Sequence, residues 1–157
     1  MPFDLNVSDT TAARAIKDYS TFQNNGTLGD GTSAYVPIWN ATGITGGAYY
    51  FDGTDDRLSI AHEQSQSIVD TAITLEAWIN TPEATSGWDK IIVKPTDGGG
   101  DPYNRYALSR NDASGIISFQ LSTGEAGSGS RADSTGNIPT NTWIHVVGTY
   151  DGRDMRL

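Results

Sequence analysis

Cysteine is absent from this chain, and basic residues are few. Without cysteine the protein has no disulfides, thiolate metal ligands or cysteine nucleophiles. Ten lysines and arginines are outnumbered by 19 acidic residues, which gives a formal net charge of −9. Because so acidic a chain repels phosphate backbones and anionic lipids, we predict no binding to nucleic acid. No apolar run approaches the roughly 18 residues that span a bilayer, so we expect no membrane span.

Helical periodicity is also scarce, and only residues 9–16 and 62–68 are compatible with short helical turns. Glycine, threonine and serine are abundant, as in strands joined by tight turns. The expected strands are Gly47–Phe51, Arg57–Ile60, Ile73–Asn80, Lys90–Lys94, Arg105–Arg110, Ile116–Ser122, Ser130–Ser134 and Trp143–Tyr150. Ala34–Trp39 is a weaker strand, because Pro37 restricts it to a sheet edge. The pattern predicts an all-β, antiparallel sandwich.

Alternation along two of these strands indicates which faces are buried. The odd-numbered residues from 73 to 79 are apolar and share one face, whereas Trp78 lies on the other. Trp78 therefore needs a cover or a ligand. Residues 143–150 carry apolar groups on both faces, which predicts a strand inside a sheet.

Four segments of the chain together resemble one family. They are Asp18–Ser20 with Asn24–Leu28, then Gly46–Asp56, Ile73–Ile79 and Asn141–Gly152. The second, GGAYYFDGTDD, is the most specific, and the last contains WIHVVGTYDG. In this order and spacing they resemble the laminin-G-like jelly-roll domains of the concanavalin-A-like lectin and glucanase superfamily, over almost the whole chain. The first segment departs from the pattern, since residues 20–23 lack the usual glycine.

The resemblance implies a single domain over residues 1–157 that lacks its C-terminal strands. The family continues beyond the Tyr-Asp-Gly turn with several strands, whereas this chain stops at Met155–Leu157. We therefore expect a fragment of a larger protein and an incomplete jelly roll. Strands left uncovered around Trp78 and Val146 would favour self-association.

Calcium is the metal ion for which the sequence offers candidate binding sites. Asp52, Asp55 and Asp56 supply carboxylates within five residues, although Asp also caps hairpin turns in which Gly53 takes a positive φ. The resemblance implies a second location at the rim of the sandwich, with Asp101, Asn104 and Asn141 as the ligands.

Catalysis is not predicted. None of the four glutamates has an acidic partner two or four residues away, the spacing that would place two carboxylates on one face of a strand. The two histidines, His62 and His145, lack the spacing of a zinc site. We expect His145 to be a buried, hydrogen-bonded structural residue on the face of Trp143 and Val147.

Trp88 and Tyr103 are the predicted ligand-binding residues, because both lie in turn-rich segments where binding residues gather. The alternative for Trp88 is that it closes one end of the core.

The resemblance implies a non-catalytic binding module, extracellular or at the cell surface, whose partner is a glycan or an extracellular protein. Two alternatives remain at this stage. One is a structural spacer, adhesin-like or virion surface domain with no small ligand. The other is a glycoside hydrolase domain whose catalytic residues lie outside this sequence.

Overall fold

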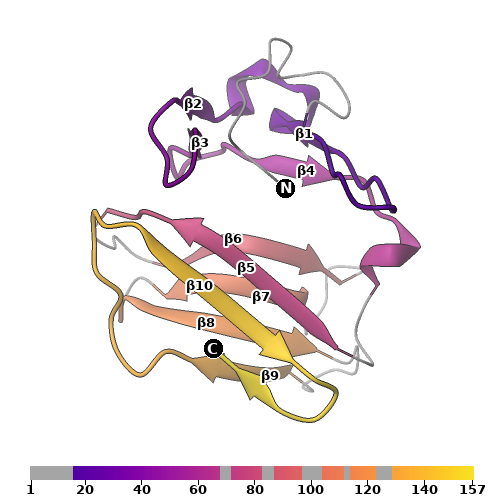
Figure 1. The fold of residues 1–157 in the computed structure, drawn as a ribbon, viewed down its shortest axis with the longest axis vertical. Helices are drawn as coiled ribbons and strands as arrows, with labels where there is room; N and C mark the ends of the chain where they lie inside the picture. The colour runs from indigo at the N-terminus through magenta and orange to yellow at the C-terminus, as the bar shows by residue number, and fades with distance from the viewer. Residues whose placement is uncertain (1–15, 68–71, 83–86, 97–103, 112–113, 123–128) are drawn as a thin grey trace. The chain divides into compact units, whose positions relative to one another are not determined.

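The structure is a computed structural model that describes residues 16–67, 72–82, 87–96, 104–111, 114–122 and 129–157 (Figure 1). The regular elements in these ranges are antiparallel strands and three short 3₁₀ turns, which confirms the all-β class. The chain divides into two compact units, Met1–Ser67 and Ile68–Leu157, and each is described by itself. The single domain over residues 1–157 stays a prediction.

Two small sheets make up the N-terminal unit. β1 (Gly26–Leu28) pairs with β4 (Leu58–Ile60), and β2 (Ile38–Asn40) pairs with β3 (Ala48–Tyr50). The 3₁₀ turns are Gly29–Gly31, Ser33–Tyr35 and Gln64–Gln66. A separate small core consists of Ile16, Leu28 and Tyr49, with Val36, Trp39 and Leu58 packed against it.

Three segments predicted in this unit can be compared with the observed elements. The strand expected at Ala34–Trp39 was only partly right, because Ser33–Tyr35 is a 3₁₀ turn and β2 begins after Pro37. The short helical turn expected near residues 62–68 is confirmed by Gln64–Gln66. The helical turn expected at residues 9–16 lies outside the described residues except for Ile16, which forms a β-bridge with Gly26.

The C-terminal unit contains two sheets whose neighbouring strands are all antiparallel. The first has the order β11-β10-β5, with β11 at Met155–Arg156, β10 at Ile144–Tyr150 and β5 at Ile73–Ile79. The second has the order β6-β7-β8-β9, with bounds Trp88–Pro95, Asn104–Asn111, Ile116–Ser122 and Gly129–Asp133. Every strand predicted in this unit is present, and β10 lies inside its sheet as its two apolar faces indicated.

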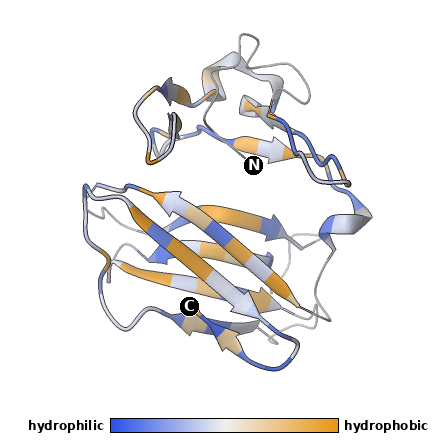
Figure 2. Ribbon diagram, in the orientation of Figure 1, coloured by the Kyte–Doolittle hydropathy of each residue, from blue (hydrophilic) through white to orange (hydrophobic). Residues whose placement is uncertain are grey.

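The core lies between these two sheets. Apolar and polar residues alternate along β5 (Figure 2). The inward residues Leu75 of β5 and Val146 of β10 join Leu108, Ile117 and Phe119 of the second sheet in one buried cluster. The Phe119 ring lies against the backbone of Gly148, so closely that a Cβ there would be 2.6 Å from the ring. The two sheets therefore pack face to face as a β-sandwich.

A β-bulge in β6 determines which of its side chains lie on the inner face of the sheet and which lie on the outer face. The pairing with β7 shifts by one residue between Lys90 and Ile92. Because of the extra residue, Ile91 and Ile92 both pack against the core, whereas Lys90 pairs with Ser109 and shares the opposite, outer face with Trp88.

Candidate functional site

The outer face of the four-stranded sheet carries a group of interacting side chains from its two edge strands. We call Trp88, Lys90, Arg131 and Asp133 the Trp88 cluster. Cross-strand pairing places Lys90, Ser109, Ser118 and Asp133 in one row on this face. Arg131 lies two residues before Asp133 on β9 and shares its face, because side chains alternate along a strand.

Two cations lie close to the Trp88 ring. The Lys90 Nζ and the Arg131 Cζ each lie 5.6 Å from the ring centroid, within cation–π range. Trp88 and Arg131 come from strands that are three spacings apart, about 14 Å. Their side chains can meet at this distance only by reaching over the outer faces of β7 and β8, so the cluster spans the sheet.

Small hydroxyl residues lie on the same face of β7 and β8. Ser109 and Ser118 are fully buried, and the Ser118 hydroxyl donates a hydrogen bond of 2.6 Å to the Asp133 carboxylate. That carboxylate also forms an ion pair of 2.9 Å with Arg131. The arginine is thus held in place, whereas Trp88 keeps 39% of its surface exposed.

The location of Trp88 differs from both locations expected from the sequence, whereas its role in ligand binding stays a prediction. Trp88 does not belong to the core cluster, and it stands in a strand rather than in a turn. Tyr103, the other predicted ligand-binding residue, lies outside the described residues. Lys90, Arg131 and Asp133 were missed. The two-residue spacing of Arg131 and Asp133 could have indicated a charged pair on one face of a strand.

A second exposed aromatic group lies on the outer face of the three-stranded sheet. Trp78 is 52% exposed and pairs across the strands with His145, whose ring stacks on it at 5.0 Å and 20°. The His145 Nε2 is 3.5 Å from a Glu76 carboxylate oxygen. The prediction of a buried His145 was therefore wrong, because Trp143 and Val147 indicate the face that this histidine shares but not whether that face is covered.

The asparagines of the predicted calcium site do not come together. Asn104 begins β7, whereas the Asn141 N–H donates to the Thr81 carbonyl beyond the end of β5. The neighbouring Pro82 carbonyl accepts a bond from Arg110, which is six residues, or about 20 Å, further along β7 than Asn104. The two asparagines thus lie near opposite ends of the sandwich. Asp101 lies outside the described residues, and calcium binding stays a prediction.

The turn that begins at Asp52 contains the other group of carboxylates that the sequence offers to calcium. Asp52 Oδ1 accepts the Thr54 and Asp55 N–H groups, and Asp56 Oδ2 accepts the Asp52 N–H. Gly53 has a φ of 79°. The three carboxylates offer oxygens within 4.8 Å of one another. Because the backbone amides already bind two of them, the arrangement is that of a self-capped turn. The hairpin expected from the sequence is absent, since β3 pairs with β2 and β4 pairs with β1.

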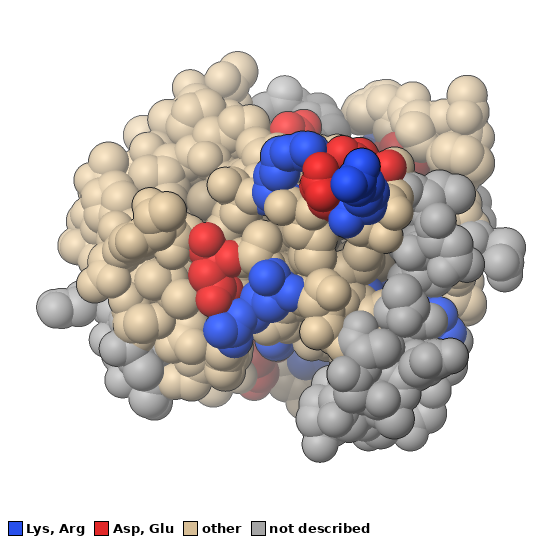
Figure 3. Space-filling view, turned by 90° about the horizontal axis from the view of Figure 1, so that it is seen from below, with Lys and Arg blue, Asp and Glu red and all other residues tan. Residues whose placement is uncertain are grey.

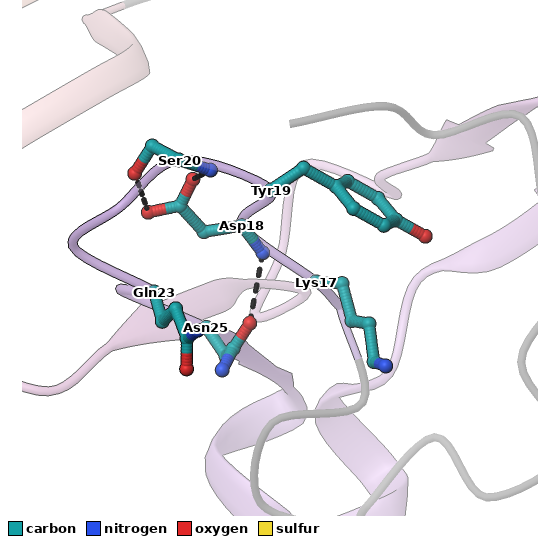
Figure 4. Close-up of a pocket in the computed structure, with 6 residues that line it drawn as sticks. All are labelled: Lys17, Asp18, Tyr19, Ser20, Gln23 and Asn25. Carbon is teal, nitrogen blue, oxygen red and sulfur yellow. Dashed lines mark hydrogen bonds between the residues drawn. The ribbon is translucent and has the colours of Figure 1, made fainter.

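A shallow pocket in the N-terminal unit is lined by the first family-like segment (Figure 4). Asp18 accepts the Ser20 N–H, the Ser20 hydroxyl and the Asn24 N–H, each at 2.8 Å. The Asn25 side chain in turn accepts the Asp18 N–H. The Ser20 and Asn24 bonds lower the pKa of Asp18, with the Ser20 backbone bond as the largest cause. Hydrogen bonds within the segment therefore hold this loop in its conformation.

Charges of both signs lie next to each other on the side of the molecule seen from below (Figure 3). Arg156 forms ion pairs with Asp151 and Asp154 at 3.0 and 3.1 Å. Among the described helical segments none has the length and hydropathy needed to cross a membrane.

Comparison with known proteins agrees with this architecture. Residues 51–157 match a laminin-G-like family described as the concanavalin A-like lectin/glucanases superfamily. The match begins within the N-terminal unit and includes the whole sandwich. Searches of curated proteins and of solved structures return no match. Since the match covers well over half of the chain, this protein belongs to the laminin-G-like family of the concanavalin A-like lectin and glucanase superfamily.

Proposed function

We propose that the chain is a non-catalytic, extracellular binding module that recognises a saccharide at the Trp88 cluster. The observation that carries the proposal is the partly exposed Trp88 ring, with the Lys90 and Arg131 cations close to it on the outer face of a sheet. An indole offers a flat apolar surface to the C–H groups of a sugar ring. The polar groups around it would fix the orientation of the ligand, as in other small-molecule sites.

The carboxylates of the described strands favour binding over hydrolysis. Retaining glycosidases need two carboxyl groups about 5.5 Å apart. Glu76 is on the three-stranded sheet, Asp133 is on the outer face of the other sheet, and Asp89 pairs with Arg110 on the inner face of that sheet. Within the described strands no two carboxylates share one face of a sheet, so no pair is in position to act together.

A glycan array probed with the full chain tests the proposal. We expect saturable binding to at least one class of glycan, and Trp88→Ala should weaken it by about tenfold or more, the usual effect of removing a central aromatic anchor. Trp78→Ala is the matched control, because it removes an exposed tryptophan from the other sheet. Thermal unfolding of both variants checks that they are folded.

Other outcomes of this experiment identify the alternatives. Absence of any saturable glycan signal would contradict the proposal and favour a spacer domain. Loss of binding in Trp78→Ala but not in Trp88→Ala would assign recognition to the outer face of the three-stranded sheet. Self-association through uncovered strands also stays a proposal, and light scattering of the chain at several concentrations tests it.

A further inference from the structure

Three tripeptides of the form Asn-X-Ser/Thr occur in the chain, and two of them lie within the described residues. They are Asn25–Thr27 and Asn40–Thr42, whereas the third begins at Asn6, outside the described part. This tripeptide, without proline in the middle, accepts an N-linked glycan in secreted proteins. Because so short a motif also occurs by chance, its structural context decides whether it can act.

The tripeptide at Asn25 is part of the packed N-terminal unit. Gly26 is buried, and its N–H donates to the Ile16 carbonyl at 2.8 Å where β1 begins. The Asn25 side chain is partly buried and accepts the Asp18 N–H at 2.8 Å. An enzyme can reach Asn25 and Thr27 together only by unpairing the start of β1, so the folded chain does not offer this site.

The tripeptide at Asn40 is open to solvent. Asn40, Ala41 and Thr42 are all exposed, at the point where β2 ends and the chain turns toward β3. The Asn40 Oδ1 accepts the Thr42 N–H at 2.9 Å, which holds the asparagine and the threonine side by side. Neither the Asn40 Nδ2 nor the Thr42 hydroxyl makes a hydrogen bond within the described residues. This site is therefore accessible without any change in the fold.

Exposed apolar side chains lie beside Asn40. Ile38 shares the face of Asn40, because side chains alternate along a strand, and Tyr50 is directly opposite Ile38 on β3. Ile38 is 67% exposed and Tyr50 is 60% exposed, which leaves an apolar pair in water on a two-stranded sheet. Exposed apolar patches favour association, and a bulky, soluble glycan next to this pair would oppose it. The surroundings of Asn40 thus give the modification a physical effect.

We propose that Asn40 is an acceptor site for an N-linked glycan and that Asn25 is not. The Asn40 Nδ2 forms a bond to the anomeric carbon of a lipid-linked oligosaccharide, while the bond from that carbon to the lipid phosphate breaks. The phosphate leaves with the electron pair of that bond, and a base of the glycosyltransferase takes the Nδ2 proton. The inference rests on the extracellular location in the proposed function, because such donors modify exported chains, and it goes beyond saccharide recognition.

Expression of the full chain behind a secretion signal in cultured eukaryotic cells tests the proposal. All proteins carry Asn6→Gln, so that the tripeptide outside the described residues does not contribute. We expect the secreted chain to carry an N-linked glycan, seen as a mobility shift that an N-glycan amidase removes. Asn40→Gln and Thr42→Ala should each abolish the shift, whereas Thr42→Ser should keep it, since serine also completes the motif. Asn25→Asp is the matched control and should keep the shift, because it removes the amide but retains the oxygen that accepts the Asp18 N–H.

A secreted chain without any N-linked glycan would overturn the proposal, and so would a glycan that persists in Asn40→Gln or is lost in Asn25→Asp. Light scattering gives a second readout, since chains from which the amidase has removed the glycan should associate at lower concentration than glycosylated chains. Equal association would refute the shielding of Ile38 and Tyr50. A glycosylated chain that binds no saccharide on the array would refute the proposed function alone, whereas saccharide binding by a chain that is never glycosylated would refute this inference alone.

Discussion

The contact between Gly148 and Phe119 gives a sharp test of the sandwich. Gly148→Ala would place a Cβ at 2.6, 2.8 and 2.9 Å from three Phe119 carbons. Phe119 is fully buried, so its ring has no free volume into which it can move. Gly148 does not have a positive φ, so the added methyl group acts through packing rather than through backbone strain.

Overpacking of this kind costs about 1–3 kcal/mol. In a unit of about 90 residues each kcal/mol lowers Tm by roughly 4–8 °C, so we expect a fall of between about 4 and 24 °C. Circular dichroism melting measures it. The control is Gly129→Ala in β9, where a Cβ would meet nothing within 4 Å and φ is not positive. Its Tm should stay the same or rise slightly.

The double variant that combines Gly148→Ala with Phe119→Leu tests whether the loss of stability comes from packing against the Phe119 ring. If the Phe119 ring is the obstacle, Phe119→Leu should relieve part of the clash, and the combined loss should be smaller than the sum by about 0.5 kcal/mol or more. Equal melting temperatures for Gly148→Ala and Gly129→Ala would refute the packing of the two sheets at this point. Strict additivity with Phe119→Leu would refute the role of the ring.

Three further predictions concern turns and ions. Gly53→Ala should destabilise the protein by about 1 kcal/mol in a denaturant titration through backbone strain alone, because φ is 79° and the added Cβ meets nothing within 4 Å; an unchanged midpoint would contradict this. The bonds from the Asp154 backbone and the Arg156 side chain lower the pKa of Asp151 to about 2 from 3.8, so its contribution to stability is present above about pH 3.8 and is lost as the pH falls through 2. The Asp151→Asn variant should therefore lose less stability than the unchanged chain when the pH falls from about 5 to about 2, as measured by acid unfolding curves. Equal losses of stability in the two proteins would contradict the lowered pKa of Asp151. If calcium binds at the start of β7, it should raise Tm over a chelator control, and Asn104→Ala should abolish the rise whereas Asn141→Ala should not; loss of the rise in Asn141→Ala would contradict the separation of the two residues.

Much of the fold could be read from the sequence because it depends on local patterns. The alternation of apolar residues in β5 and β8 reflects the two-residue period of a strand, and this period placed Leu75 and Phe119 toward the core. The turn at Asp52 was likewise legible, since an aspartate followed by glycine caps its own backbone. The family-like segments correspond to these same elements, so the resemblance and the periodicity agreed.

The composition of the candidate site depended on tertiary structure. Alternation shows which residues share a face but not which face is covered, and for this reason His145 was expected to be buried although it is exposed beside Trp78. The bulge that turns Lys90 and Trp88 outward arises from pairing with β7, and no local pattern in β6 indicated it.

By itself, the sequence determined the all-β class, the strands of the sandwich, the residues that share each strand face and the family, because each is encoded in neighbouring residues. Only the tertiary structure decided that Trp88 of β6 meets Arg131 of β9 above two intervening strands. Contacts between residues so far apart in the sequence depend on strand order and register. Those follow from the packing of the whole sheet rather than from any one segment.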